Sequence, residues 1–383
     1  MEPREPLNSG DKPRHRPLTP FRILRGVLML VIFVSTAFMA LAYFAPVAAV
    51  LIRLFSIRHS RRAVSFLFGT WLSMWPFMFE KINGTKVIFS GETVPNKERA
   101  LILANHRTEV DWMYLWNFAA RKGCLGCLKY VLKSSLMKVP LLGWGFQILE
   151  YIPVERKWEI DEASMRHMLS SYKSPDDPLW LAVFPEGTDF TEQKCISSQK
   201  FAAENGLPIL KNVLLPKTRG FYACFETLRS SLDAVYDVTI GYKHRCPLFI
   251  DNVFGVDPAE VHIHVSRISV AEIPTSPDDA ASWLIERFRI KDQLLSDFAE
   301  CGRFPGPETE GDLPMRSFLL TYAIVISLTC LYVYLTVFSS VWFKVYVWLS
   351  CSYLTAASLF NIRPSPILSS VKRALCFSLP KSS

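Results

Sequence analysis

Long apolar runs without charge lie near both ends of this 383-residue chain. The first extends from Val27 to Ile52. Two more follow one another from Ser317 to Phe343 and from Val345 to Ile362, separated only by Lys344. A helix of roughly 20 apolar residues is long enough to cross the hydrocarbon core of a bilayer. The sequence therefore predicts three membrane helices, which a soluble globular protein would not carry.

A fourth apolar stretch, from Ala63 to Phe79, is slightly shorter than a bilayer crossing requires. Its length and its two tryptophans fit a span, a re-entrant segment or a helix in the membrane interface. Arg22 and Arg25 precede the first apolar run, as basic residues precede a cleaved signal peptide. That run is longer than the apolar region of such a peptide, so we interpret it as an anchor.

The formal net charge of +8 could indicate nucleic-acid binding, but the polar middle of the chain has no basic stripe interleaved with aromatic residues. The densest basic patches flank the apolar runs instead, where anionic lipid headgroups are the natural partners. These residues are Arg14, Arg16, Arg22, Arg25, Arg53, Arg58, Arg61, Arg62, Arg363, Lys372 and Arg373. Both sides of the first run are basic, so the charges leave its topology open.

The nine cysteines are scattered and odd in number, which argues against a disulfide framework and for a reducing compartment. Cys124 and Cys127 have the spacing of half a zinc site, but no second pair follows, and we expect packing thiols. His262 and His264 share a strand face without a third ligand in view. On a cytosolic face, the sequon at Asn83 would stay unmodified. No metal site is expected.

Composition divides the chain into a basic tail (1–20), an N-terminal membrane region (21–79), a polar domain (80–315), a C-terminal helical pair (316–362) and a second basic tail (363–383). Within the polar domain, short β-type runs alternate with helical patterns, which is typical of an α/β domain. The expected strands are Lys86–Ser90, Ala100–Ala104, Trp180–Phe184, Val235–Gly241 and Val261–Ile268. The expected helices are Glu109–Arg121, Glu159–Tyr172, Thr191–Glu204, Gly220–Leu232 and Ala280–Phe298.

Residues with catalytic chemistry gather where the expected strands end. The strand that ends at Ala104 leads into Asn105-His-Arg-Thr-Glu-Val-Asp111. In this turn Asp111 can fix one ring nitrogen of His106 while the other accepts a proton from a hydroxyl group. Alternatively, Thr108 and Asp111 form a capping box at the start of the next helix. Local sequence alone leaves these two interpretations even.

Further polar residues are weak signals when taken one by one. Phe184-Pro-Glu-Gly-Thr188 follows another expected strand, and its Gly187 would let the backbone approach an anionic headgroup. The same letters are more often just a turn. Arg156 would be a surface ion-pair residue in most proteins, and Lys133 a solvated helix charge.

Together, the order and spacing of these residues resemble the glycerophospholipid acyltransferase family across the whole polar domain. The family's first motif, a His and an Asp with four residues between them, is matched by His106 and Asp111. Its third motif, a Glu-Gly block, is matched by Glu186 and Gly187. The nearest members are plant-type 1-acyl-glycerol-3-phosphate acyltransferases, with animal lysocardiolipin acyltransferases nearby.

The remaining motifs agree, with one departure. The second motif of the family ends in an Arg, matched by Arg156, but Glu155 stands where the family usually has an apolar residue or Asp. The fourth, a Pro-centred apolar block, is matched by Val213-Leu-Leu-Pro216. Lys133 begins a segment similar to the one that the family has between its first and second motifs.

The resemblance implies a glycerolipid acyltransferase-type α/β domain flanked by membrane helices, in the endoplasmic reticulum membrane with its catalytic side facing the cytosol. It implies that His106, held by Asp111, deprotonates the hydroxyl of lysophosphatidic acid, which attacks the thioester of acyl-CoA. No cofactor besides this co-substrate is expected. Residues implied to bind substrate are Lys133, Arg156, Glu186, Gly187, Thr188 and Pro216. We expect Glu186 to orient Arg156 or another cation, because its own charge repels phosphate.

Alternatives from other classes are a catalytically silent lipid-binding scaffold and a hydrolase. A silent scaffold predicts degraded catalytic positions, whereas every core residue is present here. Membrane anchoring does not distinguish an acyltransferase from a hydrolase that uses the same dyad to activate water. The acceptor stays open among lysophosphatidic acid, lysophosphatidylglycerol, lysophosphatidylinositol and lysocardiolipin. A covalent intermediate is disfavoured because the chain has no Gly-x-Ser-x-Gly elbow.

Overall fold

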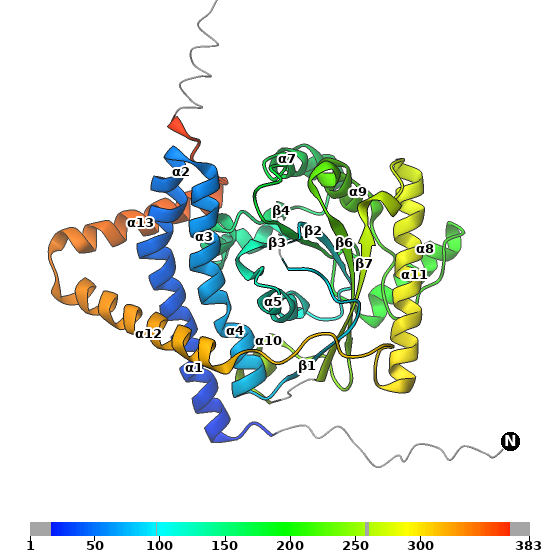
Figure 1. Ribbon diagram of the computed structural model, residues 1–383, viewed down its shortest axis with the longest axis horizontal. Helices are drawn as coiled ribbons and strands as arrows, with labels where there is room; N and C mark the ends of the chain where they lie inside the picture. The colour runs from blue at the N-terminus through cyan, green and yellow to red at the C-terminus, as the bar shows by residue number, and fades with distance from the viewer. Residues whose placement is uncertain (1–16, 97, 257–259, 368–383) are drawn as a thin grey trace, which may run out of the picture.

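The computed structural model describes residues 17–96, 98–256 and 260–367. A bent N-terminal helical region stands beside the polar domain (Figure 1). Thr19 accepts the Arg22 amide at 3.3 Å and caps the first helix, and Pro20 at the first turn has no amide hydrogen to satisfy. Pro46 separates two π-helical turns, since it lacks the amide hydrogen that a regular turn needs. The elements are α1 (Pro20–Met39), π-helical turns Ala40–Phe44 and Val47–Leu51, α2 (Ile52–Phe55), α3 (Ile57–Leu72), α4 (Met74–Phe77) and a third π-helical turn, Met78–Ile82.

A mixed seven-stranded sheet forms the centre of the polar domain, in the order β1-β7-β6-β2-β5-β3-β4. Five strands, β6, β2, β5, β3 and β4, run parallel, and β7 and β1 run the opposite way. Strand bounds are β1 Lys86–Gly91, β2 Ala100–Ala104, β3 Leu128–Lys133, β4 Ile152–Val154, β5 Trp180–Val183, β6 Ala234–Tyr242 and β7 Glu260–Ser269. All five expected strands are confirmed. The sequence reading missed β3, with its two lysines, and β4, which is three residues long and contains Pro153.

Both faces of the sheet are covered, as expected for the α/β class, because successive side chains of a strand point to opposite faces. Ala100, Ile102 and Ala104 join the core under α5 and the N-terminal helices. Leu101 and Leu103 join the core under α7, α9 and α11. Helix bounds are α5 Asp111–Arg121, α6 Leu142–Ile148, α7 Trp158–Ser170, α8 Glu192–Glu204, α9 Thr218–Leu228, α10 Phe249–Phe254 and α11 Pro277–Cys301. The five expected helices are present, with shifted ends.

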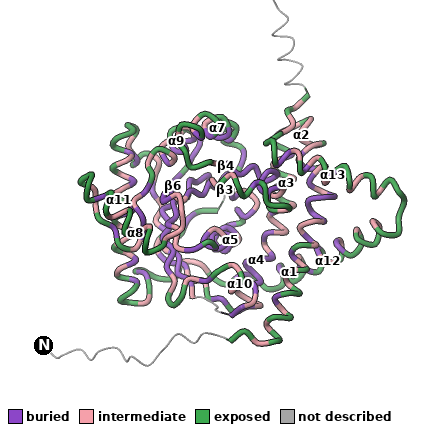
Figure 2. The backbone as a smooth tube through the Cα atoms, turned by 180° about the vertical axis from the view of Figure 1, so that it is seen from behind, coloured by how far each residue is buried: buried purple, intermediate pink, exposed green. Residues whose placement is uncertain are grey.

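The C-terminal pair, α12 (Met315–Phe338) and α13 (Val341–Phe360), forms a V that projects away from the polar domain (Figure 1). Figure 2 shows long exposed stretches on both helices, which carry apolar side chains such as Leu320 and Trp348. The break between the two helices lies at Ser339 and Ser340, so Lys344 is inside α13 and not at the break, as the sequence reading had it.

Two helices are long and apolar enough to cross a membrane, by length and composition within the described residues: Pro20–Phe44 and Met315–Phe338. The third expected span, α13, does not pass this test, because Lys344 and several hydroxyl-bearing side chains make it less apolar, and its crossing of the membrane stays a prediction. The uncertain stretch from Ala63 to Phe79 is divided among α3, α4 and the third π-helical turn. Several of its side chains are buried. The expected tails lie mostly outside the described residues.

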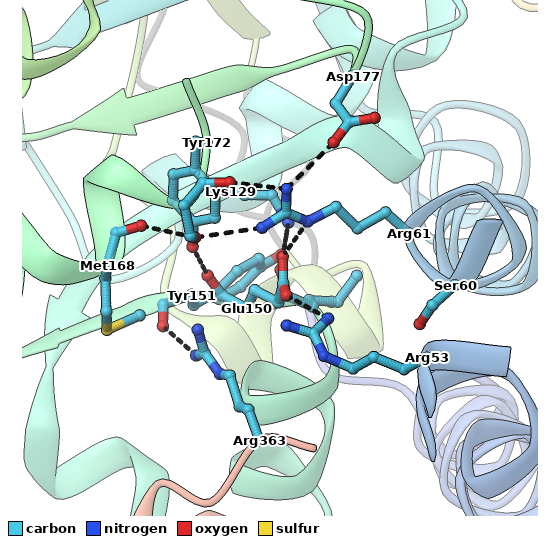
Figure 3. A network of polar contacts seen from close by, with 12 residues as sticks. Arg53, Ser60, Arg61, Lys129, Glu150, Tyr151, Met168, Tyr172, Asp177 and Arg363 are labelled. Carbon is cyan, nitrogen blue, oxygen red and sulfur yellow. Dashed lines mark hydrogen bonds and ion pairs between the residues drawn. The ribbon is translucent and has the colours of Figure 1, made fainter. Parts of the chain in front are cut away.

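One buried carboxylate joins the N-terminal helices, the sheet and the end of α13 (Figure 3). Glu150, just before β4, is 4% exposed and binds Arg53 of α2 at 2.7 Å and Arg61 of α3 at 2.8 Å. Lys129 of β3 lies 3.5 Å from the same carboxylate. Arg53 also donates to the carbonyl of Pro364 at 2.9 Å, which fixes the chain after α13. The helices α2 and α3 and the chain after α13 are therefore tied to the sheet of the polar domain.

Candidate active site

Two predicted motifs meet at the carboxyl edge of the parallel strands, where β2 and β5 end side by side. Asn105 follows β2 and extends its pairing with β6 through its side chain. The Asn105 amide group donates to the Ile240 carbonyl at 3.0 Å and accepts the Ile240 amide at 2.7 Å. This pair of hydrogen bonds to the neighbouring strand β6 fixes the backbone that carries His106.

The side chains of His106 and Asp111 are in contact, as their spacing predicted, and their catalytic role stays a prediction. Nδ1 of His106 lies 2.9 Å from Oδ2 of Asp111, which is fully buried at the first turn of α5. A carboxylate only accepts hydrogen bonds, so Nδ1 carries the proton and Nε2 keeps a free lone pair. Within the described residues, Nε2 has no hydrogen-bond partner. The imidazole is thus arranged to accept a proton through Nε2.

The capping interpretation is half right. Oδ2 of Asp111 also accepts the Thr108 amide at 2.9 Å, as in a capping box. The Thr108 hydroxyl does not reciprocate, because it donates to the Pro247 carbonyl at 2.8 Å, and Val110 is the N-cap of α5. One carboxylate therefore contacts the histidine and accepts a backbone amide just before the start of α5, so each of the two interpretations that the sequence left even agrees with part of the geometry.

Tyr242, which the sequence reading missed, completes the surroundings of Asp111. Its hydroxyl donates to Oδ1 of Asp111 at 2.5 Å from the last residue of β6. Nothing in the local sequence marks this contact, because Tyr242 lies 131 positions after Asp111. The contact can be expected only once the strand order is known, because β6, which ends at Tyr242, lies next to β2 in the sheet.

Charge around the imidazole favours its protonated form. Burial lowers the pKa of His106, but the hydrogen bond and charge of Asp111, helped by the charge of Glu186, raise the pKa above its ordinary value. Burial raises the pKa of Glu186 to about 7, against the opposing effect of two backbone donors. The carboxyl group of Glu186 therefore influences the charge of His106 through space, while its hydrogen bond is to the His106 backbone amide and not to the ring.

Glu186 has a different task from the one expected. Its Oε1 accepts the His106 amide at 2.6 Å, and its Oε2 accepts the Leu214 amide at 2.8 Å. The carboxyl group is 3% exposed and makes no contact with Arg156 within the described residues. The expected pairing is therefore wrong: Glu186 ties the first motif to the fourth through the backbone, because two amides in a buried loop need an acceptor.

Gly187, Thr188 and Pro216 lie around this junction. Gly187 has φ of +72°, and a side chain there would meet Lys217, whose Nζ is 3.2 Å from the Cβ position. Pro216 is buried, and the Lys217 amide donates to the Pro185 carbonyl at 2.8 Å. The Thr188 hydroxyl accepts from Lys194 at 2.8 Å. The third and fourth motifs thus form one surface beside His106.

Arg156 follows β4 and Lys133 is the last residue of β3, at the same edge of the sheet, and both are exposed. Lys133 ends a strand and is not the helix charge that the sequence suggested. Arg156 has φ of +65°, and Asp161 holds this turn by accepting the amides of Glu155 at 2.7 Å and Lys157 at 3.0 Å. Neither cationic side chain has a partner within the described residues. Both remain free to meet an anion.

The other histidines and cysteines considered from the sequence serve the scaffold. His262 bonds Glu260 at 3.0 Å, and His264 bonds Ser90 at 3.2 Å. No group of three or more possible metal ligands occurs in the part of the chain that the structure describes. In the same part, the cysteines are free thiols, including Cys124 and Cys127.

Comparisons with known proteins agree with this geometry. The family model for acyltransferase matches residues 86–243, and the model for acyltransferase C-terminus matches residues 252–326. Probable 1-acyl-sn-glycerol-3-phosphate acyltransferase 5 of Arabidopsis thaliana is 57% identical over 364 residues, 95% of this chain and 97% of that protein. Lysocardiolipin acyltransferase 1 of Mus musculus is 35% identical over 283 residues, 70% of this chain and 75% of that protein.

Among solved structures, the 1-acyl-sn-glycerophosphate (LPA) acyltransferase PlsC from Thermotoga maritima covers 72% of this chain and 97% of its own. Its sequence identity is 15% and its TM-score 0.44. The relative from Arabidopsis thaliana, matched along nearly the whole chain, and the family models covering the sheet and the site show that the chain belongs to the glycerophospholipid acyltransferase family, as its motifs indicated.

Proposed function

We propose that this protein transfers an acyl group from acyl-CoA to the sn-2 hydroxyl of lysophosphatidic acid, as a 1-acyl-sn-glycerol-3-phosphate O-acyltransferase. The contact of His106 Nδ1 with Asp111 at 2.9 Å, which leaves Nε2 free, carries the proposal. The names of relatives from Arabidopsis thaliana and Brassica oleracea, 57% and 38% identical, support this acceptor.

In the proposed reaction, Nε2 of His106 takes the proton of the acceptor hydroxyl as that oxygen attacks the thioester carbonyl carbon. The tetrahedral intermediate then expels CoA thiolate, which recovers the proton from the imidazolium, and the new ester bond remains. Asp111 stabilises the imidazolium through Nδ1. This sequence needs no covalent enzyme intermediate and no cofactor besides the acyl-CoA co-substrate.

Arg156 and Lys133 are the proposed ligands of the acceptor phosphate. β4 lies three places from β2 in the sheet, which at about 4.8 Å per strand puts Arg156 roughly 14 Å from the dyad. An arginine side chain and a glycerophosphate together can span that gap. Gly187, Thr188 and Pro216 then line the surface between them, and Glu186 holds that surface in place without touching substrate.

The proposed location is the endoplasmic reticulum membrane with the catalytic domain on the cytosolic side, where acyl-CoA is available. Thiol labelling of intact microsomes tests this. Cys301 is exposed at the end of α11 and is the suitable reporter, whereas Cys195 is buried. Asn83 is also buried and donates to the Asn252 carbonyl, so its sequon reports nothing on a folded chain. Protection of Cys301 until the membrane is permeabilised would contradict a cytosolic domain.

A panel of acceptors tests the reaction. Membranes containing the protein receive labelled acyl-CoA with lysophosphatidic acid, lysophosphatidylglycerol, lysophosphatidylinositol or lysocardiolipin, and with His106→Ala as the control. The proposal expects phosphatidic acid as the main product and a loss of at least about 100-fold in the variant. Lysocardiolipin is the second candidate acceptor, because relatives with that name are 35% to 38% identical. Free fatty acid as the main product would instead indicate a hydrolase.

A further inference from the structure

Asp111 receives more hydrogen bonds than orientation of a histidine requires. Its Oδ2 accepts from His106 and from the Thr108 amide, and its Oδ1 accepts from the Tyr242 hydroxyl. The Tyr242 contact measures 2.5 Å, within the range of a hydrogen bond from a hydroxyl to an ionised carboxylate. Asp111 is fully buried, so these donors replace the water that would otherwise stabilise its charge.

Tyr242 is fixed in place from two sides. Its ring meets the ring of Tyr114 edge to face at a centroid distance of 5.9 Å. The loop that follows it is tied to the first motif, because the Thr108 hydroxyl donates to the Pro247 carbonyl at 2.8 Å and the Phe249 amide donates to Glu109 at 2.9 Å. The end of β6 and the loop after it therefore hold Tyr242 against Asp111.

We propose that Tyr242 is a positioning residue that sets the pH range of catalysis, because its hydroxyl donates to the buried Asp111 carboxylate and limits how strongly Asp111 holds a proton on His106. The inference rests on the proposed roles of His106 and Asp111. Without this donor, the charge on Asp111 is less stabilised and the carboxylate becomes a stronger base. His106 then keeps its second proton to higher pH. The active form, with neutral His106, appears only at higher pH.

Several charged or titratable groups influence Tyr242 and His106. Asp111, Tyr114 and Cys246 act on Tyr242, and Asp111, Glu186 and Asp189 act on His106. Arg107 faces Cys246 in turn. Burial and the charge of Asp111 raise the pKa of Tyr242 well above its ordinary value, so the phenol stays neutral throughout the working range. Burial raises the pKa of Glu186 to about 7, and His106 and Asp111 influence it in turn, so each variant is compared with the complete pH profile of wild type.

The test is the pH dependence of kcat/KM for the full-length protein in membranes, for wild type, Tyr242→Phe and Tyr114→Phe. The matched control removes the neighbouring Tyr114 hydroxyl, which donates to the Asn252 side chain at 2.9 Å. In Tyr242→Phe the acid limb should move up by about one pH unit, since a hydrogen bond to a charged group is worth on the order of tenfold. The acid limb of the pH profile of Tyr114→Phe should coincide with that of wild type. An unmoved limb in Tyr242→Phe, or equal movement in both variants, overturns the inference.

A second substitution should move the acid limb of the pH profile in the opposite direction, and it tests the inference even if Tyr242→Phe misfolds. 3-Fluorotyrosine at position 242 keeps the shape and is a stronger donor, so the acid limb should move to lower pH. Movement upward, or none, counts against the assignment even if Tyr242→Phe is unstable. Failure of the dyad itself is distinguishable, because His106→Ala would then retain activity. If only the Tyr242 inference is wrong, His106→Ala is inactive while the limb stays fixed.

Discussion

Asp111→Asn separates the charge of the dyad from its geometry. An amide offers one accepting oxygen and one donating nitrogen where the carboxylate offers two accepting oxygens. The Thr108 amide and His106 both point at Oδ2, so an amide nitrogen there would face the Thr108 donor. The oxygen must therefore occupy that position, and the nitrogen turns to Tyr242, whose hydroxyl can rotate to accept. His106 therefore keeps its proton on Nδ1 in this variant.

The cost then comes from the lost charge. A hydrogen bond to a charged group contributes roughly 1.5–3 kcal/mol and one between neutral groups roughly 0.5–1.5 kcal/mol. The difference of about 1–2 kcal/mol corresponds to a rate reduction of roughly 5- to 30-fold. Loss of the charge of Asp111 also removes the main influence that raises the pKa of His106, so the acid limb should move to lower pH.

Initial rates with acyl-CoA and lysophosphatidic acid, measured between about pH 5 and 9 and normalised to protein abundance, check this prediction. A loss near 10⁴-fold, as a reversed tautomer produces, would refute the orientation argument. Unchanged rates with a lower melting temperature would show that Asp111 serves only the start of α5.

Three further variants probe the surrounding residues. Arg156→Ala should raise the KM for lysophosphatidic acid more than that for acyl-CoA, with Lys157→Ala as the neighbouring control; equal effects on both substrates would remove Arg156 from the phosphate site. In Glu186→Gln the side chain can accept a hydrogen bond from only one of the two backbone amides, so kcat should fall without a change in KM that is specific to the acceptor. A KM pattern like that of Arg156→Ala would instead indicate that Glu186 pairs with Arg156. The pKa of Glu186 is raised from 4.5 to about 7, so its contribution to stability is complete below about pH 4.5 and is lost as the pH rises through about 7; melting temperatures at pH 5 and 8 should show this slope in wild type and not in Glu186→Gln. Glu150→Gln leaves Arg53 and Arg61 buried without their carboxylate and should cost about 3–5 kcal/mol, seen as a lower melting temperature in detergent; an unchanged value would mean that the junction contributes little.

Local sequence was sufficient wherever one segment carries its own signal. Short apolar runs located five of the seven strands of the sheet, and the uncharged runs located α1 and α12. The spacing of His106 and Asp111 was also readable, because five positions across a strand end and a helix start bring two side chains together without help from distant residues. These features follow from covalent geometry and from the periods of helices and strands.

Tertiary structure decided every contact between segments far apart in the chain. The edge strand β4 has three residues and a proline, and it exists as a strand only because β3 pairs with it. Glu186 bonds Leu214 and the His106 backbone, and Tyr242 reaches Asp111, only after the sheet sets the strand order β6-β2-β5. The same holds for Glu150, whose cationic partners come from α2, α3 and β3. A buried polar group takes whichever partner the packed strands bring within about 3 Å, and that partner is set by sheet register and not by neighbouring residues in the sequence.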